Sequence, residues 1–376
     1  AFSMLTPEGC AARRGRLWNS LPEPCDALLL TTPESLVYFA NYAPSPFVFN
    51  TVESAAALVL RPDRATLIGD NLLRPFLDSS CADEVVTLEW YTGKQSAPCR
   101  RLSLFDELVA RHLPAGGGKC LGVESRRLGA QSASKLLLLD PLVRALRRTK
   151  DEDELAVIRE SVRAGEAAHA AALAEMRPGM TELDAFLLVS AAACRALGKQ
   201  VLVYGDFASG PRCEIERGGP PGRRVINRGD LLLLDFSVIV HGYRGDFTNT
   251  FVVGDNPTPR QNELYALCME ALEAGESMLR PGVEGRAVDA AVRGHFARHG
   301  MAEHFPSHTG HGLGLGHPEP PYLVPESTDT LQAGDVVALE PGLYVPGVGG
   351  MRFERNYLIT PLGHETLTRH RLGLLA

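Results

Sequence analysis

Acidic side chains placed in and after apolar segments are the first feature of this sequence that could do chemistry. Asp235 interrupts the apolar run 231–240, and Asp246 follows a turn at His241-Gly242. A carboxylate inside a buried strand is costly unless it is paired or binds a metal. An antiparallel hairpin would make the two carboxylates near neighbours across the ladder, where a divalent cation relieves their repulsion.

A second pair of acids has the same arrangement further along the chain. Glu340 ends the apolar run 336–339, and Glu354 follows the glycine-rich turn 346–350. Four carboxylates that converge in a core would need about two metal ions to balance their charge. His311, which lies between two glycines, could add an imidazole, because glycine permits close approach of the backbone.

The two acidic pairs belong to segments that look duplicated. Pro178-Gly179 and Pro281-Gly282 lie 103 residues apart, and Gly229-Asp230 and Gly334-Asp335 lie 105 residues apart, each Gly-Asp before an apolar run that ends in an acid. We interpret this as a repeated helix–helix–strand unit of about a hundred residues. The alternative is a chance recurrence of common turn dipeptides. A pseudo-twofold relation between the copies would bring the acidic pairs face to face.

Helix signals support two helices in each copy. Capping boxes are expected at Thr149 with Glu152 and at Thr181 with Asp184, and Thr258 precedes a third helix. The four helices are expected over 149–179, 181–198, 258–282 and 288–300.

The first part of the chain has a different pattern and is expected to be a separate domain. Single cores stop growing near ~250–300 residues, so two domains are expected, over 1–147 and 148–376. The first is expected to be α/β, with a glycine turn at 116–118 and no gathering of acids, histidines or nucleophiles. Its expected strands are Ala27–Thr31, Ala55–Leu60, Ala65–Ile68 and Glu84–Leu88, and its expected helices are Leu102–His112 and Ala130–Leu139.

Composition excludes several classes of protein. The formal net charge of −7 over 376 residues argues against a nucleic acid or an anionic membrane as partner. Apolar runs are too short for a membrane span, and the first residues do not resemble a signal peptide. The eight cysteines form no C-x-x-C spacing, so reduced thiols and a cytoplasmic location are expected.

The acids and the histidine, with their local motifs, resemble the pita-bread metallohydrolases, and in particular the aminopeptidase P, prolidase and creatinase branch. The matching segments are Leu234–Phe236, Gly242–Thr248, Gly310–Gly314, Glu340–Tyr344 and Arg352–Glu354. The resemblance covers about 150–376. It implies an α+β fold, in which a duplicated, pseudo-twofold pita-bread catalytic domain follows a smaller α/β creatinase-type domain.

The resemblance also implies a mechanism and a set of ligands. Two divalent metal ions, of Mn, Zn or Co, would share a hydroxide that attacks an amide carbonyl. Glu340 would also carry the proton of the attacking water, as a catalytic residue. A homodimer is a further expectation from the relatives. The five implied metal ligands are Asp235, Asp246, His311, Glu340 and Glu354.

The sequence departs from the family pattern at its other histidines. Pro318 stands where relatives usually have a histidine, and His317 lies one place earlier. Ser307 stands where Xaa-Pro-processing relatives often have a histidine, and His308 lies beside it. His308 and His317 remain candidate catalytic residues. Arg217, near the place of a third expected histidine, is either a clamp for a substrate carboxylate or an exposed loop residue.

Three functions follow from these patterns, in order of preference. The first is a dinuclear metal-dependent peptidase that cleaves Xaa-Pro bonds, as an aminopeptidase or a dipeptidase, with a peptide as its partner. The second, motivated by the altered histidines, is an amidohydrolase of a small non-peptide C–N bond. The third is a non-catalytic binding protein on the same fold. The sequence identifies no substrate-binding residue.

Overall fold

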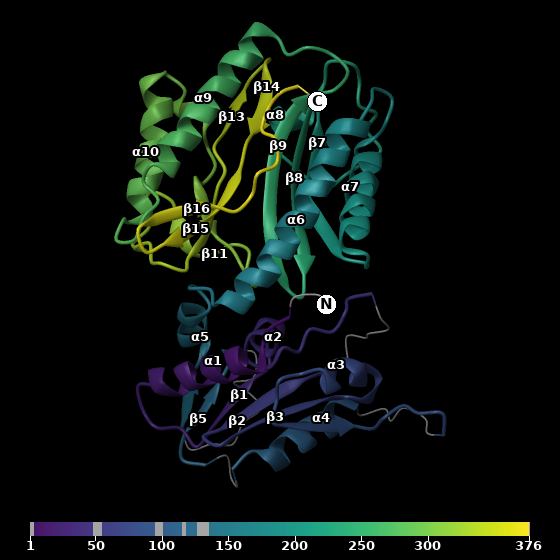
Figure 1. The fold of residues 1–376 in the computed structure, drawn as a ribbon, viewed down its shortest axis with the longest axis vertical. Helices are drawn as coiled ribbons and strands as arrows, with labels where there is room; N and C mark the ends of the chain where they lie inside the picture. Colours follow the sequence, from purple (N-terminus) through teal and green to yellow (C-terminus); the bar gives the residue numbers. More distant parts are fainter. Residues whose placement is uncertain (1–3, 48–54, 95–100, 115–117, 126–134, 376) are drawn as a thin grey trace. The chain divides into compact units, whose positions relative to one another are not determined.

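The computed structural model describes residues 4–47, 55–94, 101–114, 118–125 and 135–375 (Figure 1). The chain divides into two compact units, Ala1–Arg147 and Arg148–Ala376. Within the described residues, no helix is both long and apolar enough to cross a membrane. The seven cysteines that the structure describes are free thiols, and Cys99 lies outside the described residues.

The first unit is built on one mixed sheet with the strand order β4-β3-β2-β1-β5-β6. The strands are β1 (Ala27–Leu30), β2 (Ala57–Arg61), β3 (Arg64–Asp70), β4 (Glu84–Leu88), β5 (Leu121–Val123) and β6 (Leu136–Leu138). The helices are α1 (Pro7–Ser20), α2 (Pro33–Ala40), α3 (Arg74–Asp78), α4 (Arg101–His112) and α5 (Asp140–Leu146). Leu29 and Val59 pair across β1 and β2 and bury their side chains in one core with Phe105 of α4.

The four predicted strands of this unit and the helix over 102–112 are confirmed. The predicted helix over 130–139 is wrong at Leu136–Leu138, which forms β6, while its first part and most of the turn at 116–118 lie outside the described residues. A short leucine run has no periodicity that separates strand from helix, and parallel pairing with β5 decides between them. The pattern did not predict α1, α2 or α5.

The second unit repeats one order of elements. The first copy contains α6 (Glu152–Glu175), α7 (Glu182–Leu197), β7 (Leu202–Ser209), α8 (Pro211–Ile215), β8 (Leu231–Val240) and β9 (Tyr243–Val252). The second contains α9 (Pro259–Glu276), α10 (Gly285–Arg298), β10 (Gly310–Gly312), β11 (Glu319–Leu323), β12 (Val336–Leu339), β13 (Gly342–Val345), β14 (Gly349–Arg352), β15 (Arg355–Thr360) and β16 (Gly363–Thr366). Two helices precede the strands in both copies, as the duplication predicted.

Threonine side chains cap two of the helices of this unit. Thr181 and Thr258 cap α7 and α9 as predicted, each with its hydroxyl accepting a backbone N–H three residues on. The predicted cap of α6 is wrong, because Asp151 rather than Thr149 is the N-cap, and its backbone N–H donates to Glu154 at 2.8 Å. Both threonine and aspartate can cap, and the path of the chain selects the later residue.

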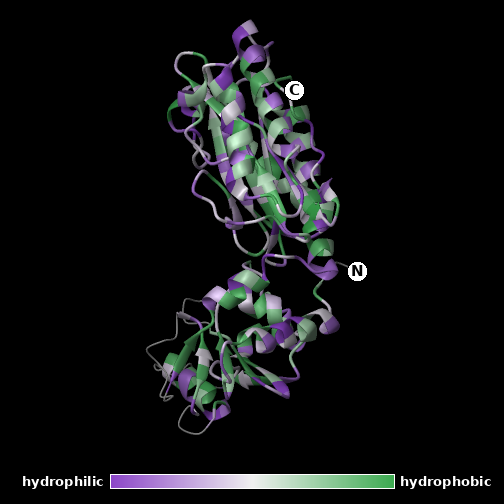
Figure 2. Cartoon of the chain, turned by 90° about the vertical axis from the view of Figure 1, so that its left-hand side faces the viewer, coloured by the Kyte–Doolittle hydropathy of each residue, from purple (hydrophilic) through white to green (hydrophobic). Residues whose placement is uncertain are grey.

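The strands of the second unit form a three-stranded sheet, β7-β8-β9, a five-stranded sheet, β11-β10-β12-β15-β16, and the hairpin β13-β14. Helix α6 packs on β8 and β9, where Gly165 leaves room for the ring of Phe247: a Cβ at this glycine would lie 2.0 Å from the ring. Figure 2 shows helices that carry both hydrophilic and hydrophobic residues around largely hydrophobic strands. This packing fixes the strands that carry the acidic residues.

Candidate metal centre

The hairpin of β8 and β9 carries the first two acids. His241 and Gly242 form its turn with φ of 51° and 84°, which suits the right-handed twist of the strands. The register pairs Asp235 with Thr248, and Asp246 with Ser237. The two acids therefore lie on one face of the hairpin as diagonal neighbours and do not pair directly. The reason is that the centre of the turn lies one residue later in the chain than the midpoint between Asp235 and Asp246. His241 is a turn residue.

The second pair of acids lies in a larger antiparallel arrangement. Strand β12 pairs with β15, and the hairpin β13-β14 continues the same register, which places Glu340 opposite Glu354. Glu354 is fully buried and accepts hydrogen bonds from Thr248 Oγ1 at 2.7 Å and from Asn356 Nδ2 at 3.2 Å. Thr248 belongs to β9, so its bond joins the two copies beside the acids.

His311 reaches these acids from β10. Its Nδ1 donates to the carbonyl oxygen of Gly312 at 3.0 Å, which directs Nε2 towards Glu340 Oε1 at 3.1 Å. The flanking glycines are needed, since a Cβ at Gly310 would lie 1.9 Å from the carbonyl oxygen of Ala338. The sequence pattern thus predicted both the imidazole and the reason for its neighbours.

The five predicted ligands and two further histidines form one cluster. Potential ligand atoms lie within 4.8 Å of one another in each of three groups. These groups are Asp235 with Asp246 and Glu354, Asp246 with His311 and His317, and His308 with His311 and Glu340. Because the groups share members, all seven side chains surround one polar interior region.

The displaced histidines both reach this cluster. His317 Nε2 lies 2.7 Å from Asp246 Oδ2, and its Nδ1 lies 3.0 Å from the hydroxyl of Tyr204. His308 Nε2 lies 2.8 Å from Glu340 Oε1 with its side chain 49% exposed, against 23% for His317. A shift of one residue along these loops is therefore compatible with an imidazole in the centre.

Arg217 does not join the cluster. It is exposed, with a positive φ of 61°, and its guanidinium lies 5.8 Å from the centroid of the Tyr344 ring. The structure thus places it on a neighbouring aromatic side chain, and no described contact joins it to the predicted ligands.

Charge and burial act together on the acids. Burial and the charge of Asp246 raise the pKa of Glu354 well above its usual range. Burial and Asp246 also raise the pKa of Asp235 to about 7, although Arg352 opposes this. Burial would raise the pKa of Glu340 as well, but His308 and His311 lower it well below its usual range.

These shifts test whether the residues fit divalent cations. Burial alone would favour neutral His311, yet the contact with Glu340 raises its pKa to about 9, so protons compete for the positions that a cation would take. Buried carboxylates that repel each other, together with imidazole nitrogens, are the donor set of Mn, Zn and Co sites. The residues present therefore fit such ions.

Arg352 is a residue of the site to which the sequence analysis gave no role. Its guanidinium forms a close ion pair with Asp235 and lies 3.2 Å from Asp206 Oδ2 and 3.8 Å from Glu340 Oε2. It also donates to Tyr344 Oη at 3.0 Å. Its position two residues before Glu354 was a usable signal, because alternate residues of an extended segment share a face.

The loop that carries His317 is held by a buried ion pair. Lys150 Nζ lies 2.5 Å from Glu319 Oε1, with the side chains 1% and 5% exposed. The other oxygen, Glu319 Oε2, accepts the backbone N–H of Gly316 at 3.0 Å. Sequence reasoning missed this pair, whose partners are far apart in the chain.

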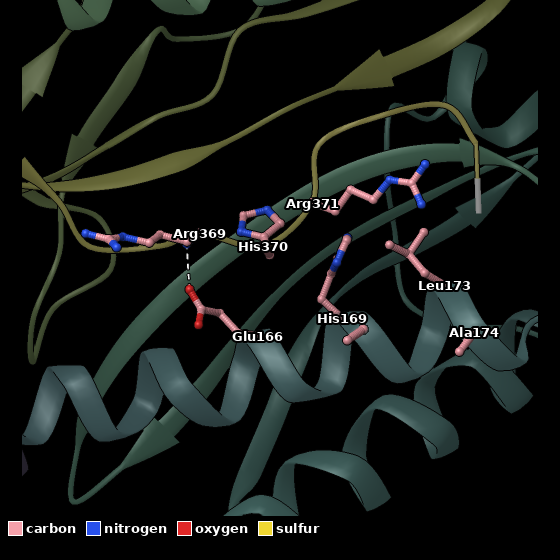
Figure 3. Close-up of a pocket in the computed structure, with 8 residues that line it drawn as sticks. Glu166, His169, Leu173, Ala174, Arg369, His370 and Arg371 are labelled. Atoms are coloured by element: carbon pink, nitrogen blue, oxygen red, sulfur yellow. Dashed lines mark hydrogen bonds between the residues drawn. The ribbon is translucent and has the colours of Figure 1, made fainter.

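A separate cavity of about 440 Å³ lies between α6 and the segment 369–371 (Figure 3). Glu166, His169 and His370 line it, and Glu166 Oε1 accepts the backbone N–H of Arg369. None of the predicted ligands lines this cavity, and the described residues that line it include no serine, threonine or cysteine. The acidic cluster therefore remains the candidate centre.

Comparisons with known proteins agree with this geometry. The sequence matches metallopeptidase family M24 over residues 156–361, and the chain belongs to this family. Enzymes of this family use divalent metal ions. A curated relative, an uncharacterized peptidase of Staphylococcus aureus (strain USA300), is 26% identical and covers 93% of this chain and 96% of its own length.

Two solved structures are similar over nearly the whole chain. An Xaa-Pro dipeptidase from Bacillus anthracis has a TM-score of 0.81 and 28% identity, covering 97% of this chain and 99% of its own. A prolidase from Pyrococcus horikoshii OT3 has a TM-score of 0.80 and 25% identity, covering 97% and 100%. The predicted pita-bread fold with its N-terminal α/β domain is confirmed.

Proposed function

We propose that this chain is a dinuclear metal-dependent peptidase that cleaves Xaa-Pro bonds, as an aminopeptidase or a dipeptidase. The observation that carries the proposal is the convergence of two carboxylate pairs and three imidazoles in one cluster, in which Asp246, His311, Glu340 and Glu354 are buried. The similar solved structures include an Xaa-Pro dipeptidase and a prolidase, and this similarity supports the choice of substrate.

In this proposal each side chain has a defined task. Two divalent ions, when bound, supply a nucleophilic water at neutral pH and polarise the substrate carbonyl. The residues that would hold them are Asp235, Asp246, His311, Glu340 and Glu354. Arg352 orients Asp235 through its ion pair and opposes the rise in the pKa of this carboxyl group that burial causes.

Glu340 is proposed to accept the proton of the attacking water and to pass it to the leaving nitrogen. His308, at 2.8 Å from Glu340 Oε1, orients this carboxylate, and its partly exposed ring can contact the substrate. His317 orients Asp246 and is itself fixed by Tyr204. General acid–base groups contribute about 10²–10⁴-fold to a rate, so these contacts are expected to matter for kcat.

The test is hydrolysis of Xaa-Pro dipeptides and Xaa-Pro-Yaa tripeptides by protein supplied with Mn²⁺, Zn²⁺ or Co²⁺, beside matched Xaa-Ala peptides. We expect cleavage only before proline, and a loss of kcat of at least about 100-fold in Glu340→Gln. Glu326→Gln, which changes an exposed glutamate, is the matched control and should retain activity. No cleavage of any Xaa-Pro peptide with any of these metals would refute the proposal.

The same assay addresses the other two functions. The displaced histidines motivated a non-peptide amidohydrolase, but both rings contact acids of the cluster, which weakens that motive. Turnover of small amides without turnover of peptides would favour the amidohydrolase, and no turnover with metal bound would favour a binding protein. The homodimer is likewise a proposal, which light scattering tests, and the cytoplasmic location stays a prediction.

A further inference from the structure

A second group of potential ligands lies on α9 and α10, and it shares no residue with the candidate metal centre. Figure 1 shows these two helices side by side. His295 lies in the last turn of α10 and His299, four residues on, is the C-cap of this helix; their ring centroids lie 4.6 Å apart. Glu270 faces them from α9.

The distances within this group suit a single ion. Glu270 Oε2 lies 3.2 Å from His295 Nε2, and one ligand atom from each of the three residues lies within 4.8 Å of the others. Two donors bound at about 2.0–2.2 Å in a tetrahedral zinc site lie roughly 3.3 Å apart. The ring centroids of His295 and His299 lie 4.6 Å apart. Small rotations of the His299 side chain would therefore bring its ring nitrogen to the same ion as the other two ligand atoms.

The hydrogen bonds of the two histidines leave their Nε2 atoms available as ligands for a cation. His295 is 8% exposed, and its buried Nε2 has no hydrogen-bond partner with good geometry among the described residues, although Glu270 Oε2 lies 3.2 Å away. His299 Nδ1 donates to the backbone oxygen of His295 at 3.0 Å, which leaves its Nε2 with a free lone pair. Burial and the neighbouring His299 lower the pKa of His295, which favours the neutral, ligating ring.

We propose that Glu270, His295 and His299 bind one Zn²⁺-like transition-metal ion that clamps α9 to α10. Two imidazoles and one carboxylate suit Zn²⁺, Ni²⁺ or Cu²⁺, whereas Mg²⁺ and Ca²⁺ require mostly oxygen ligands. Glu270 and His299 are exposed, so water can fill the remaining position. The positive charge of Arg298 opposes binding, and the carboxylate of Glu270 offsets it.

The test counts metal ions on the full chain. Protein is first saturated with Mn²⁺, then equilibrated with excess Zn²⁺, and total metal per chain is measured by mass spectrometry. Wild type is compared with His299→Ala and Glu270→Gln, which change exposed side chains and should fold. His304→Ala and Glu273→Gln, a nearby histidine and an exposed glutamate of α9, are the matched controls.

We expect wild type and both controls to hold one more equivalent of metal than either cluster variant. Zn²⁺ should also raise Tm more in wild type than in His299→Ala, because an ion that binds only the folded state stabilises it. Equal metal content and equal Tm shifts in all five proteins would overturn the proposal. The result is independent of hydrolysis, since every variant keeps the candidate metal centre.

Discussion

Removal of one partner from the buried pair Lys150–Glu319 is expected to be strongly destabilising. In Glu319→Gln the Lys150 ammonium stays buried without its counter-charge, and Gly316 loses a charged acceptor. Hydrogen bonds to charged groups contribute about 1.5–3 kcal/mol each, so the two bonds of Glu319 together give about 3–6 kcal/mol. This range agrees with the roughly 3–5 kcal/mol that breaking a buried ion pair costs.

The assay is urea unfolding of Glu319→Gln, Lys150→Met and the double variant. We expect each single change to cost about 3–5 kcal/mol, and the double variant to cost much less than their sum, since it leaves no unpaired charge. Glu365→Gln is the matched control: its ion pair with Arg159 is 45–46% exposed, so it should change stability by less than about 1 kcal/mol.

The pair should also affect activity, because Gly316 directly precedes His317. We expect Glu319→Gln, assayed under folding conditions, to lower kcat more than it changes KM. A cost below about 1 kcal/mol in Glu319→Gln would refute the argument from burial. An additive double variant would show that the two charges do not act as a pair.

Gly165→Ala should destabilise the fold by about 1–3 kcal/mol in the same urea assay, because the added methyl group would clash with Phe247. The control is Gly294→Ala in α10, where the methyl group would meet only the flexible end of an arginine, so this change should be neutral or stabilising. Burial and the charge of Arg355 lower the pKa of His169 to about 4, against about 6.5 in the unfolded chain. As the pH falls from 6.5 to 4, the unfolded state takes up a proton that the folded state does not. Stability should therefore fall by at most about 3 kcal/mol, and His169→Leu should flatten that part of the pH–stability curve. Dialysis against a chelator should abolish hydrolysis and Mn²⁺ should restore it; activity that survives a metal content near zero would contradict the proposed function.

The sequence predicted which acidic side chains converge at the candidate centre because hairpins and repeats are local patterns. An acid inside an apolar run, a turn that begins six residues later and a second acid place two carboxylates on one face of a sheet, as in Asp235 and Asp246. The repeat then implied the second pair. The same local logic predicted the caps at Thr181 and Thr258, where the backbone contact spans only three residues.

Local sequence patterns predicted the structure less reliably where the same residues are compatible with two different local structures. Both Thr149 and Asp151 can cap α6, and the leucines of β6 suit a strand or a helix. In each case contacts with a distant segment select one outcome. For β6 the selecting contact is its parallel pairing with β5.

Only the tertiary structure decided which other side chains reach the acids. His308 and His317 are out of place by one residue in sequence, yet loop paths bring their rings to Glu340 and Asp246. Arg352 pairs with Asp235 from more than a hundred residues away. Sequence spacing fixes which residues share a strand or a helix face, but contacts between distant segments depend on how the whole core packs, and no local pattern encodes that.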